Sequence, residues 1–328
     1  MAPPRPRPVP ALDLRLSRSA LAGMAVWLGL LFVPPAVEAG PAEEAAHLVI
    51  LAPLALVPLF VQASVPAGFG EAPRLLRVAS WLLLPGALAA AASLVVPTGP
   101  LAGALAALWA VPTGLVALWA LGGAVRPLRD GTLSLPEAAV AVGWATLPGG
   151  AVWLALARGA GETAYGGLIE LLTAAHFHYA GALAAVWAGL LGRVVAPGLR
   201  RLWGALAVGL VVGFWGVAVG IALGRGPVGG SAVETVGVVA LAASAVGLGA
   251  LALWEARRVD DRTSGLMIAV SGGALALAMG LALWFHLGGR FASGPDVAWM
   301  VERHGALVAY GFGLWGALGW RRVRPRPL

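Results

Sequence analysis

Ten runs of about 20 mostly apolar residues, the length of a membrane-spanning helix, follow one another along this 328-residue chain. Short segments with Pro, Gly and Arg separate them, and no polar segment is long enough to form a separate soluble domain. The sequence predicts an all-α, polytopic transmembrane helical bundle that forms one integral membrane domain over residues 1–328. The tails are predicted at 1–18 (Pro/Arg-rich) and 321–328 (Arg-rich), and the spans at about 19–35, 44–65, 76–96, 100–123, 137–157, 166–190, 202–224, 232–254, 264–288 and 297–319.

Composition supports lipid as the solvent. Hydrophobic residues make up 59% of the chain and charged residues 11%, whereas about a quarter of the residues of a soluble domain are charged. The net charge of +7 comes from Arg in short loops, and no basic helix is available to bind phosphates, so no nucleic-acid partner is expected. The absence of Cys excludes disulfides, thiolate metal sites and cysteine nucleophiles.

The distribution of Arg predicts the orientation. With an even number of spans, 18 of the 22 basic residues lie on one side, and four lie on the other: Arg158, Arg225, Arg290 and Arg303. Short Arg-rich loops stay in the cytoplasm, so both termini are predicted inside, in a prokaryotic-type cell membrane. Val37-Glu38-Ala39 also fits a signal peptide cleaved after Ala39; an uncleaved first helix is preferred.

Ionisable residues gather in the predicted outer half. Such groups are costly in hydrocarbon and are by default candidates for function. Interfacial snorkelling or capping is the alternative, above all for the first-turn acids of the second span. The outer-half set comprises His47, His176, His178, His286 and His304, with Glu43, Glu44, Glu170, Glu234 and Glu302.

The segment from Glu170 to Gly181 carries the strongest pattern. Residues two apart on a helix point in nearly opposite directions, so His176 and His178 are predicted to face different sides. Thr173 and Tyr179 flank His176 at three residues on either side and are predicted to orient its ring. Glu170 would continue a polar path to the outside.

This segment, together with Arg303-His304-Gly305 and Gly311-Phe312, resembles the two motifs of the YndJ-like family. That family consists of multi-pass membrane proteins without an established activity, sometimes described as transporters. The chain departs from the second motif at Val308, where the family has Asn, and at Arg303, where it has Thr. A hydrogen bond through that Asn is therefore not expected here.

A second, local resemblance concerns Ala175 to Tyr179. It is similar to the helix of heme-copper oxidase catalytic subunits on which two His residues ligate hemes on opposite faces. The resemblance implies His47 as a second axial ligand. Neither His-Pro-Glu nor His-His occurs, so oxygen reduction of the oxidase kind is not expected.

Three functions stay open, and the sequence leaves open whether the protein is an enzyme. The first is heme or transition-metal binding for redox chemistry or sensing, since imidazole suits iron, copper and zinc. The second is a solute transporter or proton-coupled carrier, although neither an internal repeat nor a polar path to the cytoplasm is visible. The third is a structural module that packs against a protein partner. With either of the first two functions, a small-molecule ligand or substrate is expected. The metal or heme ligands would be His176, His178 and His304, with His47 and His286 in reserve; Glu170, Thr173, Tyr179, Glu234, Glu302 and Arg303 would be their hydrogen-bond partners or a proton path.

Glycine spacing predicts one close helix contact. Gly209, Gly213, Gly216, Gly220 and Gly224 recur at steps of four residues, with one step of three, along the seventh span. Small residues at this spacing let a neighbouring backbone approach.

Overall fold

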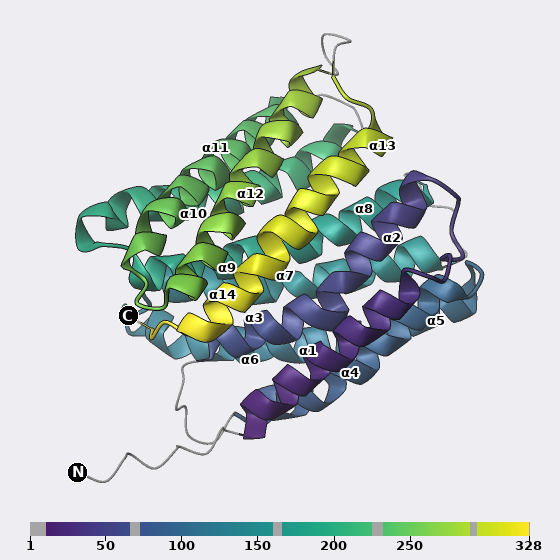
Figure 1. Ribbon diagram of the computed structural model, residues 1–328, viewed down its shortest axis with the longest axis horizontal. Helices are drawn as coiled ribbons and strands as arrows, with labels where there is room; N and C mark the ends of the chain where they lie inside the picture. The colour runs from purple at the N-terminus through teal and green to yellow at the C-terminus, as the bar shows by residue number, and fades with distance from the viewer. Residues whose placement is uncertain (1–10, 66–72, 160–165, 225–231, 289–293, 328) are drawn as a thin grey trace.

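The computed structural model describes residues 11–65, 73–159, 166–224, 232–288 and 294–327. Within these ranges the chain is helical and forms no strand. Ten helical rods follow one another in the described part of the chain, some built from several consecutive elements (Figure 1). They are α1 (Ala11–Leu30); α2 (Pro41–Leu51), η1 (Ala52–Leu56) and α3 (Val57–Ser64); α4 (Arg74–Val95); α5 (Pro100–Ala107) and α6 (Ala110–Arg129); α7 (Leu135–Arg158); α8 (Gly167–His176), η2 (Phe177–Leu183) and α9 (Ala184–Val194); η3 (Pro197–Leu199) and α10 (Arg200–Gly224); α11 (Ala232–Glu255) and η4 (Ala256–Arg258); α12 (Arg262–Gly288); and α13 (Val297–Met300), η5 (Val301–Gly305), η6 (Leu307–Leu314) and α14 (Trp315–Val323).

The all-α membrane-type fold predicted from the sequence is confirmed. Eight rods among the described residues are long and apolar enough to cross a membrane. The first and last rods are not among these eight: α1 carries Asp13, Arg15 and Arg18, and the last rod carries Glu302 and Arg303 among its charges. Each of the ten predicted spans coincides with one rod, and the largest differences are the start of the first and the end of the fourth.

The first helix begins before the predicted first span, which starts at about residue 19. Helix α1 already begins at Ala11, because its polar side chains find partners in the bundle. Arg15 donates to Ser80 Oγ at 2.9 Å and its guanidinium lies over Trp81. Gln62 donates to the main-chain oxygen of Asp13 at 3.1 Å. Residues 1–10 lie outside the described residues, as do Arg225 and Arg290 of the Arg count.

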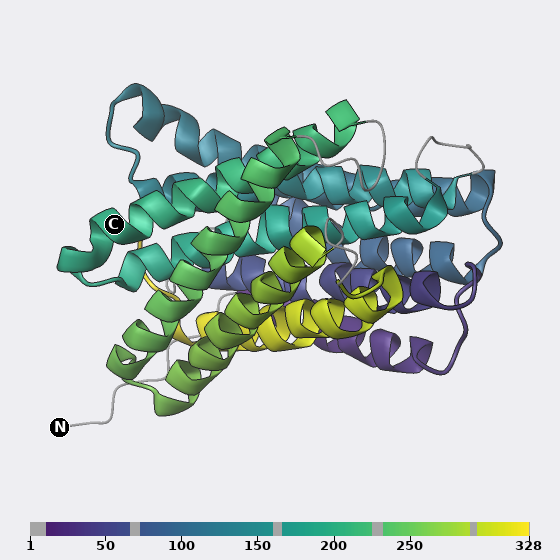
Figure 2. The ribbon, with the colours of Figure 1, turned by 90° about the horizontal axis from the view of Figure 1, so that it is seen from above.

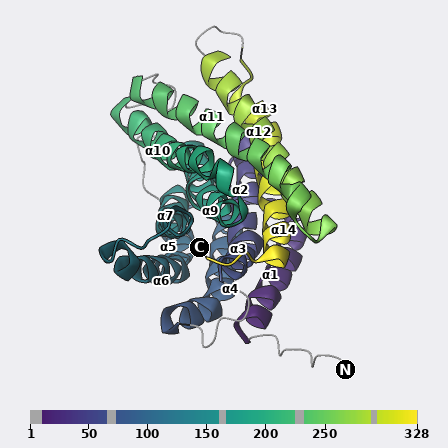
Figure 3. The same cartoon turned by 90° about the vertical axis from the view of Figure 1, so that its left-hand side faces the viewer.

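The two described ends of the chain meet. Asp13 in α1 forms an ion pair with Arg324, which directly follows α14. This contact puts both described ends of the chain at the same end of the bundle, the end that faces the viewer in Figure 3. An even number of crossings requires this arrangement. The opposite end, where α2, α8 and α13 begin, is called the outer end here, after the predicted orientation.

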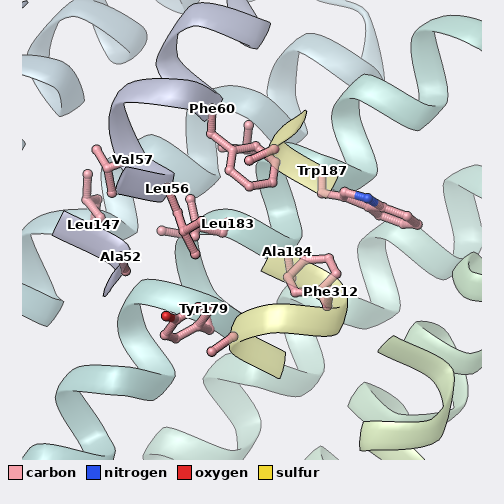
Figure 4. Packing of buried hydrophobic residues seen from close by; sticks show 14 of the residues in the cluster. Ala52, Leu56, Val57, Phe60, Leu147, Tyr179, Leu183, Ala184, Trp187 and Phe312 are labelled. Atoms are coloured by element: carbon pink, nitrogen blue, oxygen red, sulfur yellow. The ribbon is translucent and has the colours of Figure 1, made fainter. Parts of the chain in front are cut away.

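Three rods form the centre: α2–α3, α8–α9 and α13–α14. The apolar windows of the first two are 89% and 83% buried. Their middles meet where η6 passes both η1 and η2: a Cβ added at Gly313 would lie 2.8 Å from Leu56 and 3.3 Å from Tyr179. Figure 4 shows Leu56, Tyr179 and Phe312 in this core, with Trp187 beside Phe312.

The predicted glycine contact is confirmed for the helix that follows. A Cβ at Gly213 would lie 2.5 Å from the Leu241 nitrogen, and one at Gly216 would lie 3.1 Å from the Gly237 Cα. Gly209 and Gly220 likewise face Ser244 and Glu234. The stripe therefore packs α10 against α11, and Figure 2 shows α11 and α12 inclined to the other helices.

Two buried arginines tie helix ends together. At the outer end, Arg158 donates to the main-chain oxygens of Ser93 and Val96, which terminate α4, and of Ala36. Such bonds satisfy carbonyls that a helix end leaves without intrahelical partners. At the other end, Arg193 forms two 2.8 Å bonds to the Glu137 carboxylate. It also donates to the main-chain oxygen of Ser64.

Candidate functional site

The central helices change their hydrogen bonding at the segments that carry the candidate residues. The α-helical pattern gives way to π-helical turns in η1, in η2 just after His176, and in η5 and η6 around His304. π-Helical turns are rare and occur frequently at functional sites. The central rods therefore depart from regular geometry where the sequence predicts chemistry.

His176 ends α8, about 15 Å along that helix from its outer start at 1.5 Å per residue. Its Nδ1 lies 2.6 Å from the main-chain oxygen of Leu172. A carbonyl only accepts, so Nδ1 carries the proton and donates, and Nε2 keeps its lone pair. The side chain is exposed by surface area, yet the surrounding protein desolvates it.

His304 in η5 has the same arrangement. Its Nδ1 donates to the main-chain oxygen of Ala278 in α12 at 2.8 Å, and this contact fixes the ring against a neighbouring helix. The side chain is partly exposed, and its imidazole is close enough to that of His176 for the two to interact electrostatically. Among the described residues, neither Nε2 has a hydrogen-bond partner.

His178 lies on the other side of its helix, as the spacing predicts. It is fully buried. Its Nδ1 donates to the main-chain oxygen of Ala174 at 2.8 Å, and its Nε2 accepts from the indole of Trp109 at 3.0 Å. Both ring nitrogens are therefore occupied, and His178 does not join the pair. Trp109 is a partner that the sequence analysis missed, since its position 69 residues away gives no local signal.

The two remaining histidines lie elsewhere. His47 Nε2 donates to the main-chain oxygen of Leu30 at 3.1 Å, and Trp27 donates back to the main-chain oxygen of His47 at 2.9 Å. This reciprocal contact joins α1 to α2. His286 lies beside Thr235, 3.2 Å away, and Glu234, 3.7 Å away, and so joins α12 to α11. Of the five His residues, only His176 and His304 therefore lie close enough to interact with each other.

The predicted hydrogen-bond partners of His176 also lie differently. Thr173 donates to the Ile169 oxygen of its own helix, and Tyr179 donates to the Leu48 oxygen at 2.7 Å. The Leu172 carbonyl orients the His176 ring instead. Glu170 is buried, and its side chain interacts with another group of the protein.

Glu302 and Arg303 do not serve the pair either. They form an exposed ion pair with each other at 3.1 Å.

A string of polar groups runs along the same helix junction. Tyr179 in η2 interacts electrostatically with Tyr310 in η6, and Tyr310 with Glu44 in the first turn of α2. Trp27 packs edge-on against Tyr310 at 5.8 Å between ring centroids. The sequence analysis missed Tyr310, although it is one of only three Tyr residues in the chain and belongs to the second motif.

Metal and heme binding fit this geometry only in part. Within the described ranges, no group of three or more His, Asp or Glu side chains is placed to hold one metal ion. A structural zinc site takes four protein ligands and a catalytic one takes three, so neither fits. Heme ligation by His178 does not fit, because its Nε2 is hydrogen-bonded. Two imidazoles fit an exchangeable ion that takes its other ligands from solvent or substrate.

Similarity to known proteins is found at the level of a protein family. The family model described as YndJ-like protein matches residues 47–312, a range that begins in α2, ends in η6 and contains all five His residues. No curated protein and no solved structure matches the chain.

Proposed function

This chain belongs to the YndJ-like protein family, and on that premise we propose that it is a proton-coupled carrier of the cell membrane. In this proposal it crosses the membrane ten times with both termini in the cytoplasm, and His176 and His304 form its proton-binding site in the outer half.

The observation that carries the proposal is that the two imidazole rings have the same hydrogen-bonding arrangement. Each donates Nδ1–H to a main-chain carbonyl, so each presents the lone pair of Nε2. His is the side chain whose charge ordinarily changes near neutral pH. Because the two imidazoles interact electrostatically and like charges repel, the pair is expected to accept one proton rather than two.

Polar groups continue from this level in both directions. Toward the outer end lies Glu44 in the first turn of α2, and it interacts electrostatically with Tyr310, which lies farther in than His304 along the last rod. Toward the other end, buried polar atoms lack a hydrogen-bond partner within the described part of the chain: the indole nitrogens of Trp187 and Trp320 and both carboxylate oxygens of Glu255. Arg258 lies 3.8 Å from that carboxylate. Unpaired buried polar groups are costly, so these atoms favour a hydrated path toward the end opposite the outer end.

The test uses proteoliposomes that contain a pH-sensitive dye and carry an imposed pH gradient. A panel of amino acids, sugars, organic acids and inorganic ions is added, and solute-dependent proton movement is recorded. His176→Gln and His304→Gln should each abolish it. His286→Gln should retain the proton movement, because His286 lies against α11 and is not part of the pair. Proton movement that persists in both site variants, or no proton movement with any solute in the wild type, would overturn the proposal.

A second candidate function is reversible binding of a transition-metal ion by the same pair. It is favoured by the Nδ1–H bonds, because metal-binding imidazoles ordinarily donate their second ring nitrogen in this way. Titration calorimetry with Zn²⁺ and Cu²⁺ on detergent-purified protein distinguishes the two functions. One bound ion per chain, lost in His176→Gln and in His304→Gln and kept in His286→Gln, would support the metal site; equal binding by all variants would exclude it.

A further inference from the structure

A surface groove lies between α12 and the last rod, and the proposed function does not use it. Its volume is about 640 Å³, and it is lined by Leu281 of α12 and by Trp299, Glu302, Arg303, Ala306, Leu307 and Gly311. No His lines it. The groove is therefore distinct from the histidine pair, although Arg303 directly precedes His304 in the chain.

The lining changes in character along the helix. Trp299, Glu302 and Arg303 lie near the outer end of the rod, whereas Ala306, Leu307 and Gly311 follow one to two turns farther in. Trp299 also packs edge-on against Trp284 of α12, with 5.7 Å between ring centroids. Indole rings favour the level of the lipid headgroups, so the polar end of the groove is at headgroup level and its apolar end points into the hydrocarbon.

The charges at the polar end are of both signs. Glu302 and Arg303 pair at 3.1 Å, and their side chains remain 51% and 59% exposed. Exposed pairs of this kind contribute little to stability. Breaking this ion pair so that each side chain binds a ligand group therefore costs little free energy. A carboxylate beside a guanidinium complements a molecule that carries an ammonium beside a phosphate.

We propose that this groove binds a zwitterionic phospholipid of the outer leaflet, with a primary ammonium in its headgroup. Arg303 would receive the phosphate, since guanidinium and phosphate form bidentate charge-assisted bonds. Glu302 would accept hydrogen bonds from the ammonium. One acyl chain would follow Ala306, Leu307 and Gly311 beside Leu281, where van der Waals packing favours it, since within the bilayer no transfer from water contributes.

Native mass spectrometry of the detergent-purified protein tests this proposal. Phosphatidylethanolamine, phosphatidylcholine and phosphatidylglycerol with identical acyl chains are added separately, and the fraction of lipid-bound protein is measured. Phosphatidylethanolamine should bind most tightly, because the choline headgroup has no N–H donor and the glycerol headgroup has no cation for Glu302. One charge-assisted hydrogen bond corresponds to about a tenfold difference in affinity.

Three variants assign the contacts. Glu302→Gln should remove the preference for phosphatidylethanolamine, Arg303→Gln should weaken all three lipids, and Ala306→Trp should block the groove. The control is Arg126→Gln with Asp130→Asn, an exposed ion pair at the end of α6, and it should bind as the wild type does. The proposal would be overturned by phosphatidylglycerol binding at least as well as phosphatidylethanolamine, by binding unchanged in all three variants, or by protein dimers in place of lipid adducts.

Discussion

The indole nitrogen of Trp109 donates a 3.0 Å hydrogen bond to Nε2 of His178, across the interface between the start of α6 and η2. With Nδ1 bound to Ala174, the neutral ring has no lone pair left. This contact makes His178 a structural residue. It leaves His176, two positions earlier at the end of α8, as the histidine of this rod that has a free acceptor. The function of the site therefore rests on His176 and His304.

Replacing Trp109 with Phe should destabilise the protein without affecting the outer site. The substitution leaves a buried acceptor on His178 unpaired, which costs about 1–3 kcal/mol. Thermal unfolding in detergent should show a lower Tm, and Trp254→Phe, at an exposed position, should leave it nearly unchanged. The double variant Trp109→Phe/His178→Phe should regain part of the loss. A Tm of Trp109→Phe equal to that of the wild type would contradict the assignment.

Removing Arg193 should be more harmful than removing an exposed arginine. Its side chain is 2% exposed, and it binds Glu137 and the end of α3. Breaking a buried ion pair from one side costs about 3–5 kcal/mol, a range lowered here because Glu137 is 25% exposed and solvent screens it. Arg193→Met should therefore unfold at lower SDS fraction than the wild type, whereas Arg126→Met, whose side chain is 92% exposed, should not.

Acid should weaken the contact between the α11–α12 turn and α14. Hydrogen bonds from Ser264 and Arg322 lower the pKa of Asp261 from its ordinary value of 3.8. A lowered carboxyl pKa stabilises the folded state above pH 3.8, and this stabilisation disappears as the pH falls through the folded-state pKa. The Tm of the wild type should therefore approach that of Asp261→Asn at acid pH and exceed it at pH 7. A constant difference at all pH values would contradict this.

The absence of native Cys makes the orientation directly testable. Single cysteines at Glu43, in the first turn of α2, and at Arg257, after α11, lie at opposite ends of the bundle. A membrane-impermeant maleimide added to intact cells should label Glu43→Cys at once and Arg257→Cys only after permeabilisation. The reverse pattern would invert the predicted topology, and labelling of both in intact cells would contradict the number of crossings between them.

The sequence predicts the rods well because lipid forces every backbone polar group into an internal hydrogen bond, and long apolar runs therefore become helices. It mispredicts the start of α1, since Asp13 and Arg15 are stabilised by Arg324 and Ser80 from distant segments. The π-helical turns have no local sequence signal that reveals them.

The site is predicted only in outline. Helical spacing separates His176 from His178, but it does not identify their partners, which come from other helices. Trp109 and Ala278 are such partners, and only packing brings them there. The same packing places His47 of α2 against α1 and His286 of α12 against α11. The scarcity of His residues and their similar depth therefore do not suffice to assign them to one site.

Nitrogen-15 NMR of the histidine-labelled protein tests the central claim most directly, because the chain holds only five His residues. Variants of each residue to Gln assign the signals. The account predicts that His176 and His304 carry a proton on Nδ1 and none on Nε2 at neutral pH, and that acidification shifts both Nε2 signals. It also predicts that His176→Gln changes the titration of His304, while His178 stays unchanged. A titration of His304 that is the same in His176→Gln as in the wild type, or Nε2 signals of a protonated ring nitrogen at neutral pH, would contradict it.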